Sequence, residues 1–171
     1  GHPFAHLLNL ATSGLHLSIK ILKESLGWRE GDEIVTTPLT FVATNHAILY
    51  ERLTPVFADV DDYLCLDPIS VADRIGPRTR AVMFVGVGGN TGQWSDVVKL
   101  CQQRGFALIL DAAHMAGTRL YGRNPALEAD SSVYSFHAVK NLPTADSGML
   151  CFAAEENDKT ARMLSWLGID K

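Results

Sequence analysis

The sequence has few cysteines, and the three that it has stand far apart. Cys65, Cys101 and Cys151 form no CxxC motif and are odd in number, so they do not indicate a disulfide framework. Such isolated cysteines usually act as small buried hydrophobes in proteins of a reducing compartment. We therefore expect a cytoplasmic protein whose thiols belong to the core.

Several other features are also missing. No apolar run is long enough to span a bilayer, and the printed sequence shows no signal-peptide layout. The net charge of −4 comes from mixed signs, so neither a nucleic acid nor a membrane is expected as a partner. There is no internal repeat and no low-complexity segment. With 171 residues, 47% of them hydrophobic, the chain can form one domain with a proper core.

What the sequence does contain is an alternation of strand-like and helix-like segments. Segments 80–87 and 106–111 are almost wholly apolar, as strands of a sheet covered on both faces must be. The predicted fold class is therefore α/β, a mostly parallel sheet flanked by helices and joined by right-handed crossovers. The predicted strands are 33–37, 55–60, 80–87, 106–111, 131–136 and 149–153, and the predicted helices are 13–26, 42–51, 68–75, 95–104 and 155–167.

Capping residues and flanking segments complete this prediction. Thr12 or Ser13 should cap the first helix, and Asp67 should cap the third, which would begin with a proline. The first residues, with His2 and His6 four apart, are expected to form a frayed terminus and no metal site. We expect 122–130 to be a mobile loop. The helix 42–51 is expected to bury Ala43, Ala47 and either Leu49 or Tyr50.

Three short stretches carry side chains that could do chemistry. Lys140 follows the strand-like run 131–136, where a partly desolvated lysine can act as an amine nucleophile. Asp111 ends an apolar strand, and 11–14 places small hydroxyl residues at a helix start. Ligands of parallel sheets bind beyond the carboxyl ends of the strands, so these residues could share one site. Taken singly, each has a plain alternative as a surface charge, a turn former or a helix cap.

The chain resembles the sugar aminotransferases of the DegT/DnrJ/EryC1/StrS family, which use pyridoxal phosphate (PLP). Four stretches carry the resemblance, which runs from about Leu10 to the last residue in the family's order. They are 31–35 with 40–44, 54–61, 110–114, and 135–141. The resemblance implies a fold-type-I aminotransferase. Because members of this family are roughly twice as long, it also implies that 1–171 is one partial PLP-binding large domain, without the small C-terminal domain.

Two catalytic roles follow from the resemblance. Lys140 would bind the aldehyde of PLP and, once an amino donor has displaced it, move a proton between the donor's α-carbon and the cofactor. Asp111 would pair with the pyridinium nitrogen and keep it protonated. A related dehydratase branch has histidine in place of this lysine, so Lys140 favours transamination.

Further residues would bind the cofactor by the same resemblance. Phe41 would stack on the ring face, and His114 would reach the ring or its phenolic oxygen. Thr12, Ser13 and Ser135 would hold the phosphate, which the start of a helix also favours. Core packing for Phe41 and a structural role for His114 remain the alternatives.

The resemblance also implies substrates and a partner. Family members transfer an amino group, usually from glutamate, to a keto group of a nucleotide-linked sugar, and they work as homodimers. This chain departs from the family pattern in three places. Ala11 replaces a usual glycine before Thr12, Asp-Ser-Gly at 146–148 replaces Glu-Gly-Gly, and 86–90 lacks a histidine. These departures bear on the substrate more than on the cofactor.

Other functions stay open on the sequence alone. Another PLP enzyme of the same fold, such as a lyase or a desulfurase, would use the same lysine, although a desulfurase also needs a mobile nucleophilic cysteine. A catalytically incompetent binding or scaffold domain is an alternative of a different class. A dinucleotide-binding domain is only a weak alternative, because no GxGxxG motif follows a predicted strand.

Overall fold

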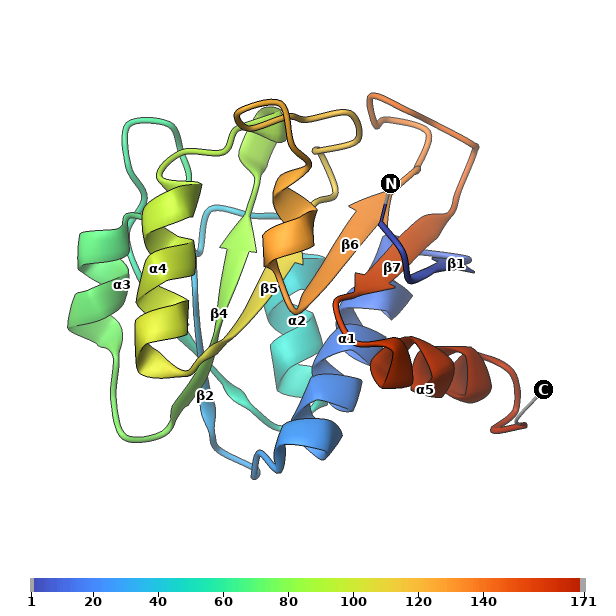
Figure 1. Cartoon of the computed structure of the whole chain (residues 1–171), viewed down its shortest axis with the longest axis horizontal. Coiled ribbons are helices and arrows are strands. Elements are labelled where there is room, and N and C mark those ends of the chain that lie inside the picture. Colours follow the sequence, from blue (N-terminus) through green and yellow to red (C-terminus); the bar gives the residue numbers. More distant parts are fainter. Residues whose placement is uncertain (1, 170–171) are drawn as a thin grey trace.

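The chain folds around one mixed sheet (Figure 1). The computed structural model describes residues 2–169. Within them, the strand order is β1 (Ala5–Leu8), β7 (Gly148–Phe152), β6 (Ser131–Ser135), β5 (Ala107–Asp111), β4 (Thr79–Val85), β2 (Glu33–Thr36) and β3 (Thr54–Phe57). In this order, all neighbouring strands between β6 and β3 run parallel, whereas β7 is antiparallel to both β1 and β6. This arrangement confirms the predicted, mostly parallel α/β sheet.

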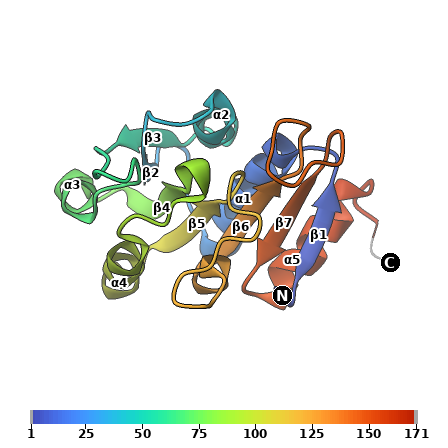
Figure 2. The same cartoon turned by 90° about the horizontal axis from the view of Figure 1, so that it is seen from above.

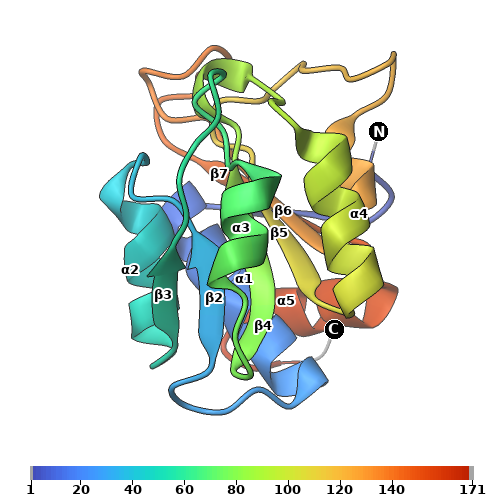
Figure 3. The same cartoon turned by 90° about the vertical axis from the view of Figure 1, so that its left-hand side faces the viewer.

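Helices cover both faces of this sheet, which Figure 2 shows from above with β3 and β1 at opposite ends. The helices are α1 (Ala11–Leu26), α2 (Val42–Tyr50), α3 (Pro68–Arg74), α4 (Trp94–Arg104) and α5 (Glu155–Ser165). Figure 3 shows α3 and α4 in front of the sheet; α1, α2 and α5 pack into the core on the other face. As predicted, Asp67 caps α3 by accepting from the N–H of Ile69. No helix within residues 2–169 is long and apolar enough to cross a bilayer.

The central strands face two cores at once. In β4, Val82 and Phe84 pack with α3 and α4, while the alternate residues Ala81 and Met83 pack with α1 and α2. Phe84 meets Trp94 of α4 edge to face, with ring centroids 5.1 Å apart. Both faces therefore need apolar side chains, which is why this strand lacks polar alternation in the sequence.

The predicted cap of α1 is wrong. The helix begins at Ala11, so Thr12 and Ser13 lie inside its first turn, and Leu10 is the N-cap without a side-chain hydrogen bond. Ser13 Oγ instead donates to Asn9 Oδ1 at 3.2 Å. The start of α1 is fixed by its approach to the sheet and not by a hydroxyl cap.

The first residues form a strand where a frayed terminus was expected. In β1, Ala5 pairs with Cys151 and Leu8 with Gly148 of β7. Arg162 of α5 adds a hydrogen bond from Nη2 to the carbonyl of Ala5, 2.7 Å long. This strand is therefore identified by its pairing with β7 and its contact with α5.

Two smaller expectations differ in part from the structure, although Ala43 and Ala47 of α2 are buried as expected. The segment 122–130, expected to be a mobile loop, contains a short 3₁₀ helix, η2 (Pro125–Glu128), whose Pro125 and Ala126 are buried. Glu128 Oε2 accepts from the indole N–H of Trp94 at 2.8 Å, which ties η2 to α4. In α2 the inward residues are Ala43, Thr44, Ala47 and Ile48, whereas Leu49 and Tyr50 are exposed.

The start of α1 lies against β7 because Gly148 has no side chain. A Cβ built there would lie 2.5 Å from the Ala11 nitrogen and 2.7 Å from the Leu10 carbonyl carbon. Gly148 also pairs with Ser135, the last residue of β6. The glycine thus lets the first turn of α1 reach the carboxyl end of the neighbouring strand.

Gly148→Ala should lower the free energy of unfolding by about 1–3 kcal/mol, because backbone atoms of α1 would have to move. Urea denaturation of both proteins measures the difference. Gly76→Ala is the matched control, since its Cβ would meet only Glu33 Oε2, at 3.4 Å. It should change the stability by less than about 0.5 kcal/mol. Equal losses in the two variants would contradict this account of Gly148.

Candidate active site

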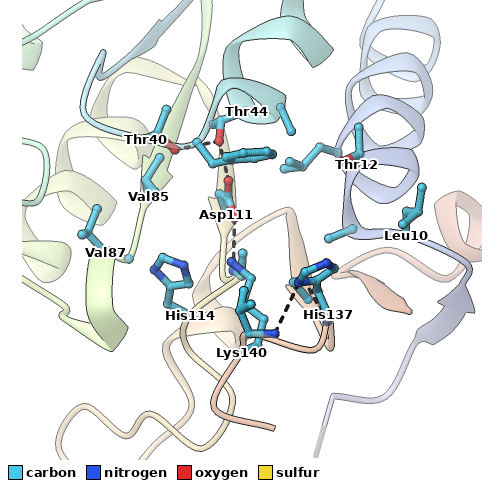
Figure 4. A pocket seen from close by; sticks show the side chains of 18 of the residues that line it. Leu10, Thr12, Thr40, Thr44, Val85, Val87, Asp111, His114, His137 and Lys140 are labelled. Carbon is cyan, nitrogen blue, oxygen red and sulfur yellow. Dashed lines mark hydrogen bonds between the residues drawn. The ribbon is translucent and has the colours of Figure 1, made fainter. Parts of the chain in front are cut away.

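A cavity of about 570 Å³ opens at the carboxyl ends of β4, β5 and β6 (Figure 4). Its lining comes from the start of α1, the segment entering α2, the ends of the strands and the loop after β6. The structure therefore brings the predicted site residues together, with one exception, Ser13. Those that line the cavity are Thr12, Phe41, Asp111, His114, Ser135 and Lys140.

Asp111, the last residue of β5, is buried beside this cavity and only 4% exposed. Its Oδ1 accepts from the N–H of Ala113 at 3.1 Å, and its Oδ2 accepts from Thr44 Oγ1 at 2.7 Å. Burial raises the pKa of Asp111, while these hydrogen bonds and nearby positive charge act to lower it. The charge on this carboxyl group therefore depends on the donors around it.

Thr44 and Thr40 are functional candidates that the sequence analysis missed. Thr44 belongs to the first turn of α2 and is buried, and its Oγ1 lies 2.8 Å from Thr40 Oγ1. Because Thr44 donates its one hydroxyl hydrogen to Asp111, Thr40 must donate to Thr44. Thr40 lies before the N-cap residue Phe41 and outside the helix, so helical spacing in the sequence gave no signal of this contact.

Lys140 lies in the loop 136–147 that joins β6 to β7. Its backbone N–H donates to the carbonyl of His137 at 2.9 Å, and Asn141 Nδ2 donates to the carbonyl of Ala116 at 2.7 Å. These bonds hold the loop over the cavity, which the half-buried Lys140 side chain lines. Among residues 2–169, no side chain or backbone group forms a hydrogen bond or ion pair with Lys140 Nζ. The amine is thus available to a ligand.

His114 lines the same cavity as Lys140, and both are labelled in the lower part of Figure 4. Its Nδ1 accepts from the N–H of Gly88 at 3.2 Å, an arrangement that needs an unprotonated Nδ1. Burial lowers the pKa of His114, and the positive charge of Lys140 lowers it further. At neutral pH the ring is therefore neutral, with its proton on Nε2.

The start of α1 brings Ala11 and Thr12 to the cavity, opposite Ser135 at the end of β6. The first N–H groups of a helix have no partner within the helix, so they favour an anion. Ser135 is buried, and its Oγ accepts from the N–H of His137 at 3.4 Å. Ser13 instead lines a separate groove between α1 and α5.

Phe41 is the N-cap residue of α2 and lines the cavity, and the residue is 74% exposed. A large aromatic side chain this exposed at the edge of a cavity is suited to cover a flat ligand. The core-packing alternative for Phe41 is excluded by its exposure.

None of the three cysteines lines this cavity. Burial raises the pKa of Cys65 to about 11, of Cys101 to about 12 and of Cys151 to about 11. Each thiol therefore stays protonated at neutral pH, and a nucleophilic cysteine of the kind that a desulfurase uses is absent from the site.

The sheet with its flanking helices is that of the fold-type-I, PLP-dependent aminotransferases. Within that class, the chain belongs to the DegT/DnrJ/EryC1/StrS aminotransferase family, whose sequence profile matches residues 1–171. The family assumed from the sequence motifs is thereby confirmed.

Three similar proteins illustrate the relationship. The spore coat polysaccharide biosynthesis protein SpsC of Bacillus subtilis is 36% identical over 172 residues, which cover 100% of this chain and 43% of SpsC. The aminotransferase TlmJ of Streptoalloteichus hindustanus superposes with a TM-score of 0.89 at 38% identity, over 96% of this chain and 44% of TlmJ. DesI, solved in the presence of its TDP-sugar product, superposes with a TM-score of 0.85 at 35% identity, over 97% of this chain and 41% of DesI. The chain spans less than half the length of these relatives.

The thiols should react slowly with an alkylating reagent in the folded protein at neutral pH. With a pKa of about 11, only about one thiol in 10,000 is ionised at pH 7. Iodoacetamide labelling followed by mass spectrometry should show all three sites at least about 100-fold slower than in denaturant. Rapid labelling of one cysteine in the folded chain would reopen the desulfurase alternative.

Proposed function

We propose that this chain is the cofactor-binding part of an enzyme that transfers an amino group, from glutamate, to a keto group of a nucleotide-linked sugar. One observation carries the proposal: the amine of Lys140, which has no partner within residues 2–169, and the buried carboxyl group of Asp111 line the same cavity, beside the start of α1. Residues 1–171 would then be a partial large domain, in keeping with the share of its relatives that the chain spans.

The residues of the cavity fit PLP. Asp111 is a buried carboxylate held by neutral donors, and a protonated ring nitrogen would supply the cation that it lacks in its immediate surroundings. The N–H groups at the start of α1, with Thr12 and Ser135 at the same edge, would hold the dianionic phosphate. Phe41 would cover one face of the ring.

When bound, PLP supplies a ring that stabilises negative charge at the carbon from which a proton leaves. Lys140 Nζ would hold the cofactor's aldehyde in the resting state and, once freed by the amino donor, carry the proton from the donor's α-carbon. Asp111 would keep the ring nitrogen protonated, which makes the ring a better acceptor of electrons. His114 would donate its Nε2 hydrogen to an oxygen on the ring, because Nδ1 already accepts from Gly88.

The substrate class and the partner chain are further parts of the proposal. DesI was solved in the presence of a TDP-sugar product, which supports a nucleotide-linked sugar here, and glutamate as donor follows from the family resemblance. Leu39, Phe41 and Val42 are exposed where the chain enters α2. A second copy covering these apolar side chains would give the proposed homodimer. The buried free thiols keep the cytoplasm as the proposed location.

A second candidate is a domain that binds the cofactor without completing the transfer. The observation in its favour is the length of the chain, which covers 43% of SpsC. Binding and transfer are therefore measured separately in the experiments below.

Mixing the chain with PLP should produce a visible absorption band that disappears in Lys140→Ala, with a loss of affinity of about 100-fold or more. Lys99→Ala is the matched control, because Lys99 is an exposed lysine of α4 paired with Asp96. Its band should equal that of the unmodified chain. A chain that gives no band, or a band that survives Lys140→Ala, would refute the cofactor assignment. Glutamate should then convert the bound cofactor to its amine form; failure of this second step alone would favour the binding domain.

Asp111→Asn should keep the absorption band but slow the conversion by glutamate about 100-fold or more, because an amide cannot hold the ring nitrogen protonated. The change removes a buried carboxylate whose pKa is raised, so the free energy of unfolding at neutral pH should not fall. Stopped-flow absorbance and urea denaturation measure the two effects. Asp73→Asn, on the exposed face of α3, should alter neither. A variant that converts glutamate at the original rate would remove Asp111 from the mechanism.

A further inference from the structure

The hydroxyl groups of Thr40 and Thr44 lie next to Asp111, and neither has a part in the proposed function above. Oδ2 of Asp111 receives one side-chain hydrogen bond, from Thr44, at 2.7 Å. Thr44 in turn lies 2.8 Å from the hydroxyl of Thr40, which lines the cavity. Two hydrogen bonds thus connect Thr40 Oγ1, Thr44 Oγ1 and Asp111 Oδ2 in a chain, as Figure 4 shows.

We propose that Thr44, supported by Thr40, is a positioning residue that holds the Asp111 carboxylate in its ionised form and aims it at the ring nitrogen of PLP. This proposal rests on the proposed cofactor. A carboxylate accepts a hydrogen bond more strongly than a neutral carboxyl group does, so donation from Thr44 favours the charged form of Asp111. A carboxylate bonded on both oxygens also has little freedom to rotate.

The remaining charges near Asp111 do not replace this hydrogen bond. The positive charge of Lys140, and that of His114 when its ring is protonated, also favour the ionised form, but their effect is smaller than that of Thr44. His114 is itself neutral when its Nδ1 accepts from Gly88. The other titratable residues of the cavity, His137 and Asp146, are exposed. The hydroxyl group of Thr44 is therefore the main side-chain interaction that opposes the effect of burial on Asp111.

The test compares Thr44→Val, which keeps the shape and loses the donor, with Thr44→Ser, which keeps the donor. Thr44→Val should weaken PLP binding about tenfold, as expected for the loss of a hydrogen bond to a charged group. Binding of an analogue in which carbon replaces the ring nitrogen should be unchanged, because that analogue has no proton for Asp111 to hold. Thr44→Ser should bind PLP and the analogue with affinities within about twofold of those of the unmodified chain.

A second measurement needs no cofactor. The pKa of Asp111 is raised in the folded chain, so the stability is highest below the unfolded-state pKa and falls as the pH rises through the folded-state value. Thr44→Val should raise that pKa further. The stability gap between Thr44→Val and the unmodified chain should therefore widen with rising pH, about tenfold in the unfolding equilibrium constant for each unit of pKa. A purely structural loss would give the same gap at every pH.

The outcomes separate the two proposals. If the unmodified chain does not bind PLP, the proposed function fails, and the pH dependence of stability still decides whether Thr44 holds Asp111 ionised. If the chain binds PLP but Thr44→Val binds it equally well, or the stability gap does not change with pH, the role of Thr44 is refuted. Should Thr44→Val not fold, Thr40→Val serves instead. It removes only the outer hydrogen bond, so a smaller shift in the same direction, about threefold, is expected.

Discussion

The site depends on how the fold stabilises a carboxyl group at the end of a buried strand. Asp111 closes β5, the strand whose other residues are apolar and packed between two layers of helices. A carboxylate in such surroundings needs donors, and the fold supplies one from the backbone just after the strand and one from the first turn of α2. The position of α2 against the sheet is thus tied to the charge of this one side chain.

A second constraint comes from the opposite wall of the cavity. The first turn of α1 reaches the carboxyl end of β6 because β7 offers a residue without a side chain at the crossing point. That glycine also pairs with β1, the strand that leads directly into α1. The pairing of β1 with β7, the close packing at Gly148 and the position of the first turn of α1 therefore depend on one another. An anion held there would meet backbone groups whose positions the sheet fixes.

Much of the fold could be predicted from the sequence because its central signals are strong and local. The wholly apolar runs around β4 and β5 and the Asp-Pro start of α3 were recognised, and the strands and helices agree with the structure to within a few residues. β1 was missed because only its pairing with β7 identifies it as a strand. The start of α1 was misplaced because packing against Gly148, and not a hydroxyl cap, determines it. Among the site residues, Lys140 and Asp111 stand in recognisable motifs, whereas Thr44 gains its role only from the contact with Asp111 across 67 positions of the chain.

The antiparallel pairing of β6 and β7 has a consequence for how such a site can diversify. Parallel neighbours in this sheet are joined through helices, but the amine of Lys140 sits in a direct hairpin connection between adjacent strands. A hairpin connection can gain, lose or exchange residues without shifting the register of the strands that it joins. The wall of the cavity around Lys140 can therefore change in length and composition while the strands of the sheet keep their register.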